Sequence, residues 1–363
     1  MGDMIDNAKH VIHLHVYILE NDETGENIIN KLCVAVTRKV KVYLLVDGYA
    51  SQALGKEFSL RMKRAGVEFK FFDPVLKSKN FYFGRRLHQK VFVVDDFYSM
   101  VGGINITDRY NDMPEQKAWL DFALYSEGPI STRLAINCWK TWTGFLKSPK
   151  QYSPLHSKLE PQSDFNNVKV KMAVNDWVKA QVQISGSYVS LLSQSREKVI
   201  LLSSYFMPGT AIRKNIKKAI KRGVKIKIII TGKSDVGISK RAERYMYDWL
   251  LRNKIEIYEY QNAVLHGKIA VGDKTLVTVG SYNVNDISAF ASVELNLDVS
   301  DNDFGAYVDK VLETVIKSDC VNITDEIVSK QKNIFHQFSL WVSYYAVRLL
   351  IILFTFYMKQ EEK

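Results

Sequence analysis

Two stretches of the chain carry the same spacing of reactive residues, and this duplication constrains the fold more than any other feature. They are LHQKVFVVDDFYSMVGGIN at 87–105 and LHGKIAVGDKTLVTVGSYN at 265–283. In each copy a His is followed two residues later by Lys, five residues after that by Asp, and then by a small pair and an Asn. The residues are His88, Lys90, Asp95, Gly103 and Asn105, and then His266, Lys268, Asp273, Ser281 and Asn283. Matched spacing in two copies indicates a duplicated functional unit, because packing alone rarely requires it.

Each copy predicts two strands. Apolar and β-branched residues follow each His up to an acidic turn, and a second strand ends at a tight bend beside the small pair. Residues two apart on a strand share a face, so each His and its Lys point the same way. A group that can carry a proton therefore lies beside a fixed cation.

The order of elements before each copy is also repeated. Before the first copy the pattern predicts a strand at 11–19, a helix at 26–39, a strand at 40–48, a helix at 58–65 and a strand at 67–72. Before the second it predicts a strand at 198–209, a helix at 211–222, a strand at 224–235, a helix at 240–252 and a strand at 255–260. This alternation predicts an α/β fold whose sheets are covered on both faces.

Composition divides the chain into four parts. A segment rich in Pro, Ser and Asn at 148–167 is the expected linker between a first half at 1–147 and a second half at 168–325, with a hydrophobic tail at 326–363. The loop at 76–86 mixes aromatic and basic residues, so it is expected to border the substrate cleft or to be an ordinary surface loop.

The N-terminus shows no pattern of a signal peptide or membrane anchor. The first strand begins so early that either the first half is compact at its start or further residues precede it. His13 and His15 alternate within this strand and are expected to be sheet residues rather than ligands.

The charge balance points to an anionic partner. The chain has 50 Lys and Arg against 39 Asp and Glu, for a net charge of +11. Nucleic acid and acidic lipid both fit this excess, so the charge alone does not choose between them.

The paired motifs suit chemistry at a phosphodiester, whose negative charge repels nucleophiles unless cations and donors surround it. Lys90, Lys268, Asn105 and Asn283 would supply these groups if the two halves face each other, with Gly103 and Ser281 as further candidates for phosphate contact. A neutral imidazole can attack phosphorus, and a second, protonated imidazole can donate to the leaving oxygen. The sequence is symmetric as to which His does which.

Two carboxylates are candidates to support the imidazoles. Asp121 and Glu294 each stand in an apolar stretch predicted to be a strand, where an unpaired carboxylate would be costly. We expect one of them behind each His, where it would fix the tautomer and raise the basicity. The alternative is a buried ion pair or an edge-strand carboxylate. Asp95 and Asp273 follow the motif strands and are expected to be structural or cation-pairing; no metal and no other cofactor is expected.

The motif pair resembles that of the phospholipase D superfamily, HxKxxxxD followed by GGxN or GSxN. The stretches GRRLHQKVFVVDD, VGGINITDRYND, WLDFALYSEGP, SSYFMPG, GKSD and YEYQNAVLHGK are similar to those of bacterial cardiolipin synthases. The resemblance implies two tandem phospholipase D-like α/β sandwich halves, with mixed sheets packed pseudo-symmetrically around one active-site cleft. It also implies transfer of a phosphatidyl group, from phosphatidylglycerol to another phospholipid, through a phosphohistidine, with His88 as nucleophile and His266 as acid and base. The chain departs from many members in lacking N-terminal membrane helices and in having SSYFMPG where a Thr-Pro-Tyr-Phe-like run is common.

The hydrophobic segment Phe338 to Met358 is long enough to cross a bilayer as a helix. Arg348 falls opposite Ser339 and Ser343 at helical spacing, so the segment lacks the coherent polar face of a simple interfacial helix. It could span the membrane or dock on the catalytic domain, and either way we expect association with the bacterial cytoplasmic membrane.

Three functions fit these observations. The first is a phosphatidyltransferase that makes cardiolipin, the second is a hydrolytic phospholipase D with water as acceptor, and the third is a phosphodiesterase or nuclease. The first is favoured by the extended resemblance and the tail. We therefore expect anionic phospholipid substrates at a membrane surface, no nucleic acid, and no obligatory protein partner, because both motifs lie in one chain.

Overall fold

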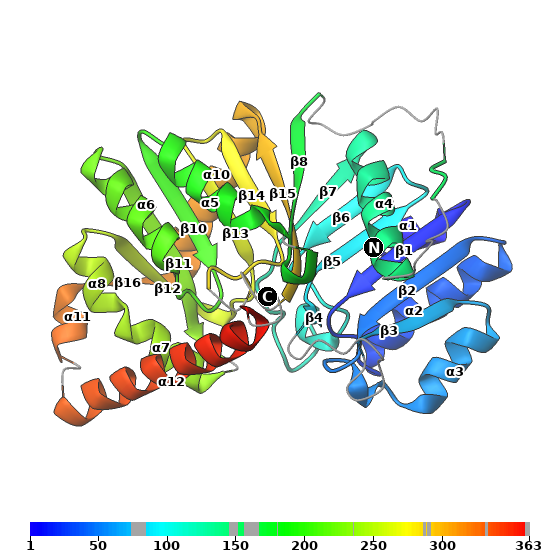
Figure 1. Ribbon diagram of the computed structural model, residues 1–363, viewed down its shortest axis with the longest axis horizontal. Helices are drawn as coiled ribbons and strands as arrows, with labels where there is room; N and C mark the ends of the chain where they lie inside the picture. The colour runs from blue at the N-terminus through cyan, green and yellow to red at the C-terminus, as the bar shows by residue number, and fades with distance from the viewer. Residues whose placement is uncertain are drawn as a thin grey trace.

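The computed structural model describes residues 1–73, 85–144, 152–155, 167–179, 181–234, 236–285, 288, 292–330 and 333–359. The chain forms two α/β halves that lie side by side, the first in blue to cyan and the second in green to orange (Figure 1). The predicted α/β fold in two tandem halves with mixed sheets is confirmed.

The first half is a six-stranded mixed sheet in the order β3-β2-β1-β5-β6-β7. Its elements are α1 (Gly2–Asp6), β1 (Val11–Val16), α2 (Glu23–Thr37), β2 (Lys41–Asp47), η1 (Gln52–Leu54), α3 (Lys56–Arg64), β3 (Glu68–Phe72), β4 (Arg86–Leu87), β5 (Lys90–Val94), β6 (Tyr98–Gly102), η2 (Asp108–Tyr110), β7 (Ala123–Glu127) and α4 (Pro129–Thr143). β1, β2 and β3 are parallel, whereas β5, β6 and β7 continue the sheet in antiparallel fashion.

The second half repeats this arrangement in a larger sheet, ordered β16-β12-β11-β10-β13-β14-β15-β8-β9. Its elements are β8 (Lys169–Asp176), η3 (Trp177–Lys179), β9 (Gln181–Val182), α5 (Gln183–Gln194), β10 (Lys198–Ser203), α6 (Thr210–Lys221), β11 (Lys225–Lys233), α7 (Gly237–Tyr245), α8 (Tyr247–Arg252), β12 (Glu256–Val264), β13 (Lys268–Gly272), β14 (Leu276–Gly280), β15 (Ser292–Ser300), α10 (Asn302–Asp319), β16 (Cys320–Ile323), α11 (Asp325–Lys330) and α12 (Ile334–Lys359). β10, β11 and β12 are parallel and β13 is antiparallel to β10, as β5 is to β1.

Helices cover both faces of each sheet, as the alternation of strands and helices predicts. In the first half Leu32 of α2 packs in one core with Leu14, and Leu134 of α4 packs in another with Val91. In the second half α5 and α6 cover one face and α10 the other. The sheet residues are therefore buried on both sides, which explains the apolar runs in β5 and β10.

Two predicted elements are wrong in their extent. The strand expected at 198–209 ends at Ser203. The helix expected at 240–252 is divided into α7 and α8 at Met246. The Met246 amide bonds to the carbonyl of Glu243, three residues back, at 2.9 Å. This tighter turn interrupts the regular i to i−4 ladder.

The halves share a core. Val91 and Val93 of β5 cluster with Leu295 and Leu297 of β15, and β6 and β7 lie against β14 and β15. This contact brings the ends of the motif strands from the two halves to one place.

Two predicted segments lie largely outside the described residues. These are the loop expected to border the cleft, at 76–84, and most of the linker, at 148–151 and 156–166. The described piece at 152–155 is attached to the first half, since the Tyr152 hydroxyl donates to Asp96 at 2.6 Å. The division at 147 and 168 remains a prediction.

The C-terminal helix α12 extends along the second half toward the middle of the molecule, drawn in red (Figure 1). It packs on α7, where Arg241 Nε donates to Ser343 Oγ at 3.2 Å. Within the described part of the chain, none of the helices combines the length and apolarity needed to cross a bilayer.

Candidate active site

The first motif is held by the second half. β4 carries the residues just before His88, and it pairs in parallel with β15, with Leu87 opposite Val293. The backbone amide of Gln89 also donates to the Val293 carbonyl at 2.8 Å. This register places the side chain that follows Val293, Glu294, next to the motif histidine.

The second motif is held by the first half in the same way. Leu265 forms a parallel bridge with Leu120, and the amide of His266 donates to the Leu120 carbonyl at 2.8 Å. The residue that follows Leu120 is Asp121, so the two crossed backbone contacts are equivalent.

Each histidine is consequently paired with a carboxylate from the other half. His88 Nδ1 lies 2.9 Å from Glu294 Oε2, and His266 Nδ1 lies 2.7 Å from Asp121 Oδ2. Both carboxylate side chains are buried, with 0% and 1% exposure. Burial makes each carboxylate depend on its imidazole partner, because an unpaired charge there would be costly.

The position of one of the two carboxylates differs from the prediction that each lies inside a strand. Glu294 lies inside β15, as expected, but Asp121 precedes β7 instead of lying within it. The amide of Phe122 donates to Asp121 Oδ1 at 2.7 Å. This local bond takes an amide that a regular strand ladder would have used.

The motif lysines lie beside their histidines, as strand alternation predicts. Lys90 Nζ donates to the His88 carbonyl at 2.6 Å, and Lys268 Nζ donates to the His266 carbonyl and lies 2.9 Å from His266 Nδ1. Burial lowers the pKa of Lys90 to about 7. A bound anion would favour the charged form of this side chain.

The motif asparagines are fixed by hydrogen bonds at their side-chain carbonyls. Asn105 Oδ1 accepts from the amide of Ile18 at 3.0 Å, and Asn283 Oδ1 accepts from Ser204 Oγ at 2.8 Å. These bonds orient the amide nitrogens, which are the donors suited to a phosphate oxygen.

Two aromatic residues were missed by the sequence reasoning. The Tyr110 hydroxyl accepts from Asn105 Nδ2 at 2.8 Å and lies 3.2 Å from His266 Nδ1. The Tyr17 ring packs edge-on against His88, with centroids 4.8 Å apart. Tyr17 follows β1, at the carboxyl end of a parallel strand, and that position is a usable signal for a functional residue.

The small pairs of the motif are explained by close approach. A Cβ at Gly103 would lie 2.4 Å from Asp121 Oδ1, so only glycine leaves room for that carboxylate. At the equivalent position Ser281 Oγ donates to Glu294 Oε2 at 2.5 Å. The longer Glu side chain is thus held by a hydroxyl, and direct phosphate contact by Gly103 or Ser281 remains a prediction.

Each motif aspartate binds the backbone at the start of the strand next to its motif strand, β1 in the first half and β10 in the second. Asp95 accepts from the amides of three successive residues, Lys9, His10 and Val11, at 2.7–2.9 Å. Asp273 accepts from the amides at 196–198 at 2.6–2.9 Å. Each aspartate has a positive φ, 52° and 49°, within a tight hairpin turn. This geometry suits the structural role expected for them.

The electrostatics favour neutral imidazoles in the free protein. Burial lowers the pKa of His266 to about 3; Lys268 adds to this effect and Asp121 opposes it. Burial also lowers the pKa of His88, with Glu294 acting in the opposite direction. A neutral imidazole whose Nδ1 donates to a carboxylate presents its Nε2 lone pair, which is the nucleophilic form.

Asp121 remains ionised in this setting. Burial alone would raise its pKa, but the Lys268 ammonium and the hydrogen bond with His266 outweigh that effect and lower it. Within the described residues neither His88 Nε2 nor His266 Nε2 has a hydrogen-bond partner. Lys268 lowers the pKa of His88 and Lys90 lowers that of His266, so the two His–carboxylate pairs lie close together.

The sequence comparisons match both halves. A family model described as cardiolipin synthase, PLD-like domain, matches residues 1–119 and 188–316. Cardiolipin synthase B of Salmonella typhimurium is 31% identical over 333 residues, covering 91% of this chain and 80% of that protein. Cardiolipin synthase B of Escherichia coli K12 is 30% identical over 330 residues, covering 90% and 79%.

The structural comparisons agree on the fold. Phosphatidylserine synthase from Haemophilus influenzae Rd KW20 superimposes with a TM-score of 0.70 at 15% identity, covering 98% of this chain and 91% of that one. Polyphosphate kinase from Porphyromonas gingivalis gives a TM-score of 0.59 at 15% identity, covering 97% and 50%. At such identities the likeness concerns the fold alone.

The matched family model spans both motifs, and the sequence relatives align over most of the chain. The same residues form one site with two histidines and two carboxylates. The chain therefore belongs to the phospholipase D superfamily as a cardiolipin synthase-like protein, an enzyme of phosphodiester transfer.

Proposed function

We propose that this enzyme moves a phosphatidyl group from phosphatidylglycerol to the glycerol hydroxyl of a second phospholipid and so makes cardiolipin. The observation that carries the proposal is the crossed pairing of His88 with Glu294 and His266 with Asp121. It gives one buried site two imidazoles whose Nε2 atoms can serve opposite faces of a phosphodiester. Relatives named cardiolipin synthase support the choice of lipid substrates.

In the first step His88 Nε2 attacks phosphorus and the bond from phosphorus to the headgroup oxygen breaks. Protonated His266 donates its Nε2 proton to that oxygen, so glycerol leaves as a neutral alcohol. The charge of the bound phosphodiester opposes the burial that lowers the pKa of His266, which allows the imidazole to hold this proton.

In the second step the acceptor hydroxyl gives its proton to His266 and its oxygen attacks phosphorus. The bond from phosphorus to His88 breaks, which regenerates both imidazoles. Lys90, Lys268 and the amide nitrogens of Asn105 and Asn283 surround the nonbridging oxygens and stabilise their charge. The assignment of His88 as nucleophile rests on the family resemblance.

The test is incubation of the purified full chain with labelled phosphatidylglycerol in mixed micelles, followed by separation of the products. Cardiolipin with free glycerol is the expected result. Phosphatidic acid without cardiolipin would replace the proposal by hydrolysis, and turnover of oligonucleotides in place of lipid would replace it by a nuclease. With label in the phosphatidyl group, protein quenched in alkaline detergent, where a phosphohistidine persists, should carry label on His88; label elsewhere would overturn the assignment of the nucleophile.

A further inference from the structure

Helix α12 has two unlike faces. Four side chains on one face are buried against the second half: Leu340, Ser343, Tyr344 and Val347. Large apolar side chains recur at helical spacing on the other face and are exposed: Phe335 82%, Phe338 63%, Trp341 46%, Val342 41%, Tyr345 45% and Leu349 56%. The helix is thus docked through one stripe and presents an aromatic stripe outward. Such a continuous apolar patch marks an interaction site.

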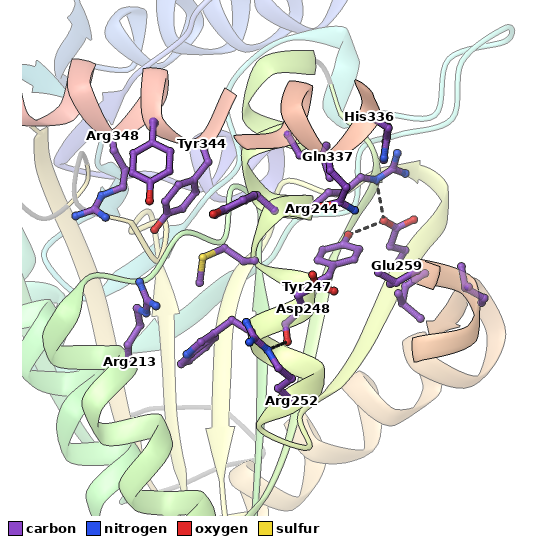
Figure 2. A pocket seen from close by; sticks show the side chains of 18 residues that line it. Arg213, Arg244, Tyr247, Asp248, Arg252, Glu259, His336, Gln337, Tyr344 and Arg348 are labelled. Atoms are coloured by element: carbon purple, nitrogen blue, oxygen red, sulfur yellow. Dashed lines mark hydrogen bonds and ion pairs between the residues drawn. The ribbon is translucent and has the colours of Figure 1, made fainter. Parts of the chain in front are cut away.

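A cavity of about 350 Å³ lies between α12 and the pair α7 and α8. Figure 2 shows arginines around it, with Arg348 from α12, Arg213 from α6, and Arg244 and Arg252 from the α7 and α8 segment. The volume and the ring of guanidinium groups suit a single anionic headgroup, because guanidinium forks bind phosphate well.

The arginines differ in how far they are neutralised. Arg244 Nε lies 3.5 Å from Glu259 Oε1, so part of its charge is compensated. Arg213 stacks on the Trp249 ring at 4.9 Å, and Arg348 lies 5.7 Å from the Tyr344 ring. Within the described residues neither Arg213 nor Arg348 forms a salt bridge. Their charges remain available to an anion.

This surface adjoins the catalytic edge of the second sheet. β11 is bonded to the second motif, because Thr231 Oγ1 accepts from the amide of Leu265 at 3.3 Å. α7 begins at Gly237, shortly after β11 ends, and α12 packs on α7. A ligand or surface bound along α12 would therefore lie near the edge of the second sheet that carries His266.

We propose that the exposed face of α12 inserts into the interfacial layer of a membrane, while the arginine-lined cavity holds the phosphate of an anionic phospholipid. Trp and Tyr side chains favour the headgroup level of a bilayer, and apolar side chains below them gain from burial in the acyl boundary. The net charge of +11 adds attraction to an anionic surface. This inference rests in part on the proposed function, since it explains how the site reaches a bilayer substrate.

The test is flotation of the full chain with phosphatidylcholine vesicles and with vesicles of equal parts phosphatidylcholine and phosphatidylglycerol. The pair Phe338→Ser and Trp341→Ser should reduce binding to the mixed vesicles at least tenfold, because two large apolar side chains lose their burial. The pair Arg213→Gln and Arg348→Gln should remove the preference for the mixed vesicles. Matched controls are Val34→Ser, which is 53% exposed on α2, and Arg133→Gln on α4; both should bind like the parent chain.

Unchanged binding by the α12 pair would overturn the proposal, and an unchanged lipid preference in the arginine pair would overturn the headgroup site. A dimer that dissociates in the α12 pair, with no vesicle binding by the parent chain, would assign the face to a second copy instead. The proposed function is tested independently of the docking, because vesicle binding requires no turnover. A chain that binds vesicles but makes no cardiolipin refutes only the catalytic proposal, and one that makes cardiolipin in micelles but ignores vesicles refutes only the docking.

Discussion

The two halves supply the same motif but support it differently. In the first copy His88 is paired with Glu294, which Ser281 holds by its hydroxyl. In the second copy His266 is paired with the shorter Asp121, and the position equivalent to Ser281 is a glycine that makes room for it. The Tyr110 hydroxyl stands near His266, whereas the Tyr17 ring packs on His88. A duplicated unit has thus become one site with two unequal imidazoles, which suits a reaction that needs one nucleophile and one acid.

The largest effect is expected from removing either imidazole. His88→Ala and His266→Ala should each lower turnover by roughly 10³-fold or more, since in the proposed mechanism one removes the nucleophile and the other the proton carrier. Lipid turnover in micelles is the measurement, with circular dichroism as the control for folding. Mixing the two inactive chains should restore nothing, because each chain holds one complete site. Full activity in either variant would show that the halves work independently.

The next effect concerns the crossed carboxylates. Glu294→Gln and Asp121→Asn should each cost about 10²-fold, because each leaves its imidazole without a negative partner. The losses of activity in the two variants should differ when the phosphatidyl donor carries p-nitrophenolate as its leaving group, because this anion departs without a proton. Release of p-nitrophenol should recover in Asp121→Asn but not in Glu294→Gln. Equal recovery in both would remove the assignment of unequal roles.

A smaller effect is expected from exchanging the small residues of the motif. Gly103→Ser introduces a Cβ that would lie 2.4 Å from Asp121 Oδ1, so the carboxylate must shift and activity should fall by more than tenfold. Ser281→Gly removes one hydrogen bond to Glu294 and should cost about tenfold at most. Turnover under identical conditions measures both. A larger loss in Ser281→Gly would reverse the order proposed for the two supports.

The smallest effect concerns stability rather than activity. The amide of Asp95 donates to the Val11 carbonyl, and the amide of Asp273 donates to the Lys198 carbonyl, so β1 and β10 can be aligned at these residues. In this alignment His13 and His15 on β1 correspond to Ile200 and Leu202 on β10. Burial lowers the pKa of His13 from 6.5 to about 4 and that of His15 to about 3. Below pH 6.5 the unfolded chain takes up protons that the folded chain cannot, so the free energy of unfolding falls as pH decreases through this window.

The double variant His13→Ile and His15→Leu should reduce this acid sensitivity, by up to about 1.4 kcal/mol per pH unit for each histidine. Urea unfolding above and below pH 6.5 measures it. The buried His88 and His266 remain, so part of the pH dependence should persist. An unchanged dependence would mean that the pair on β1 is not its source.

Much of the fold follows from local pattern. Apart from the strand expected at 198–209, which ends at Ser203, apolar runs and turn residues predict the strands and helices around each motif to within a few residues, because both depend on neighbours in the sequence. The exceptions have local causes that residue type does not reveal. Met246 divides a predicted helix by a tighter turn, and the Phe122 amide binds Asp121 instead of joining a strand.

The environment of the C-terminal segment could not be predicted from its sequence pattern alone. Its hydrophobicity is plain in the sequence, but the pattern alone leaves open whether the segment spans a bilayer or docks on protein. Only its packing on α7 separates a buried stripe around Leu340 and Tyr344 from an exposed one around Phe338 and Trp341. The direction that a helix faces depends on its neighbour, and that neighbour is far away in sequence.

The duplicated spacing alone reveals that the chain carries two copies of one reactive unit, and it identifies the histidines, lysines, asparagines and both candidate carboxylates. That the partners are crossed appears only in the folded chain, where His88 binds a residue 206 positions away and His266 binds one 145 positions away. Within one half, spacing is fixed by the covalent chain and can be read directly. Between halves, pairing is fixed by the strand register of β4 on β15 and of Leu265 on Leu120, which forms only when the two sheets pack.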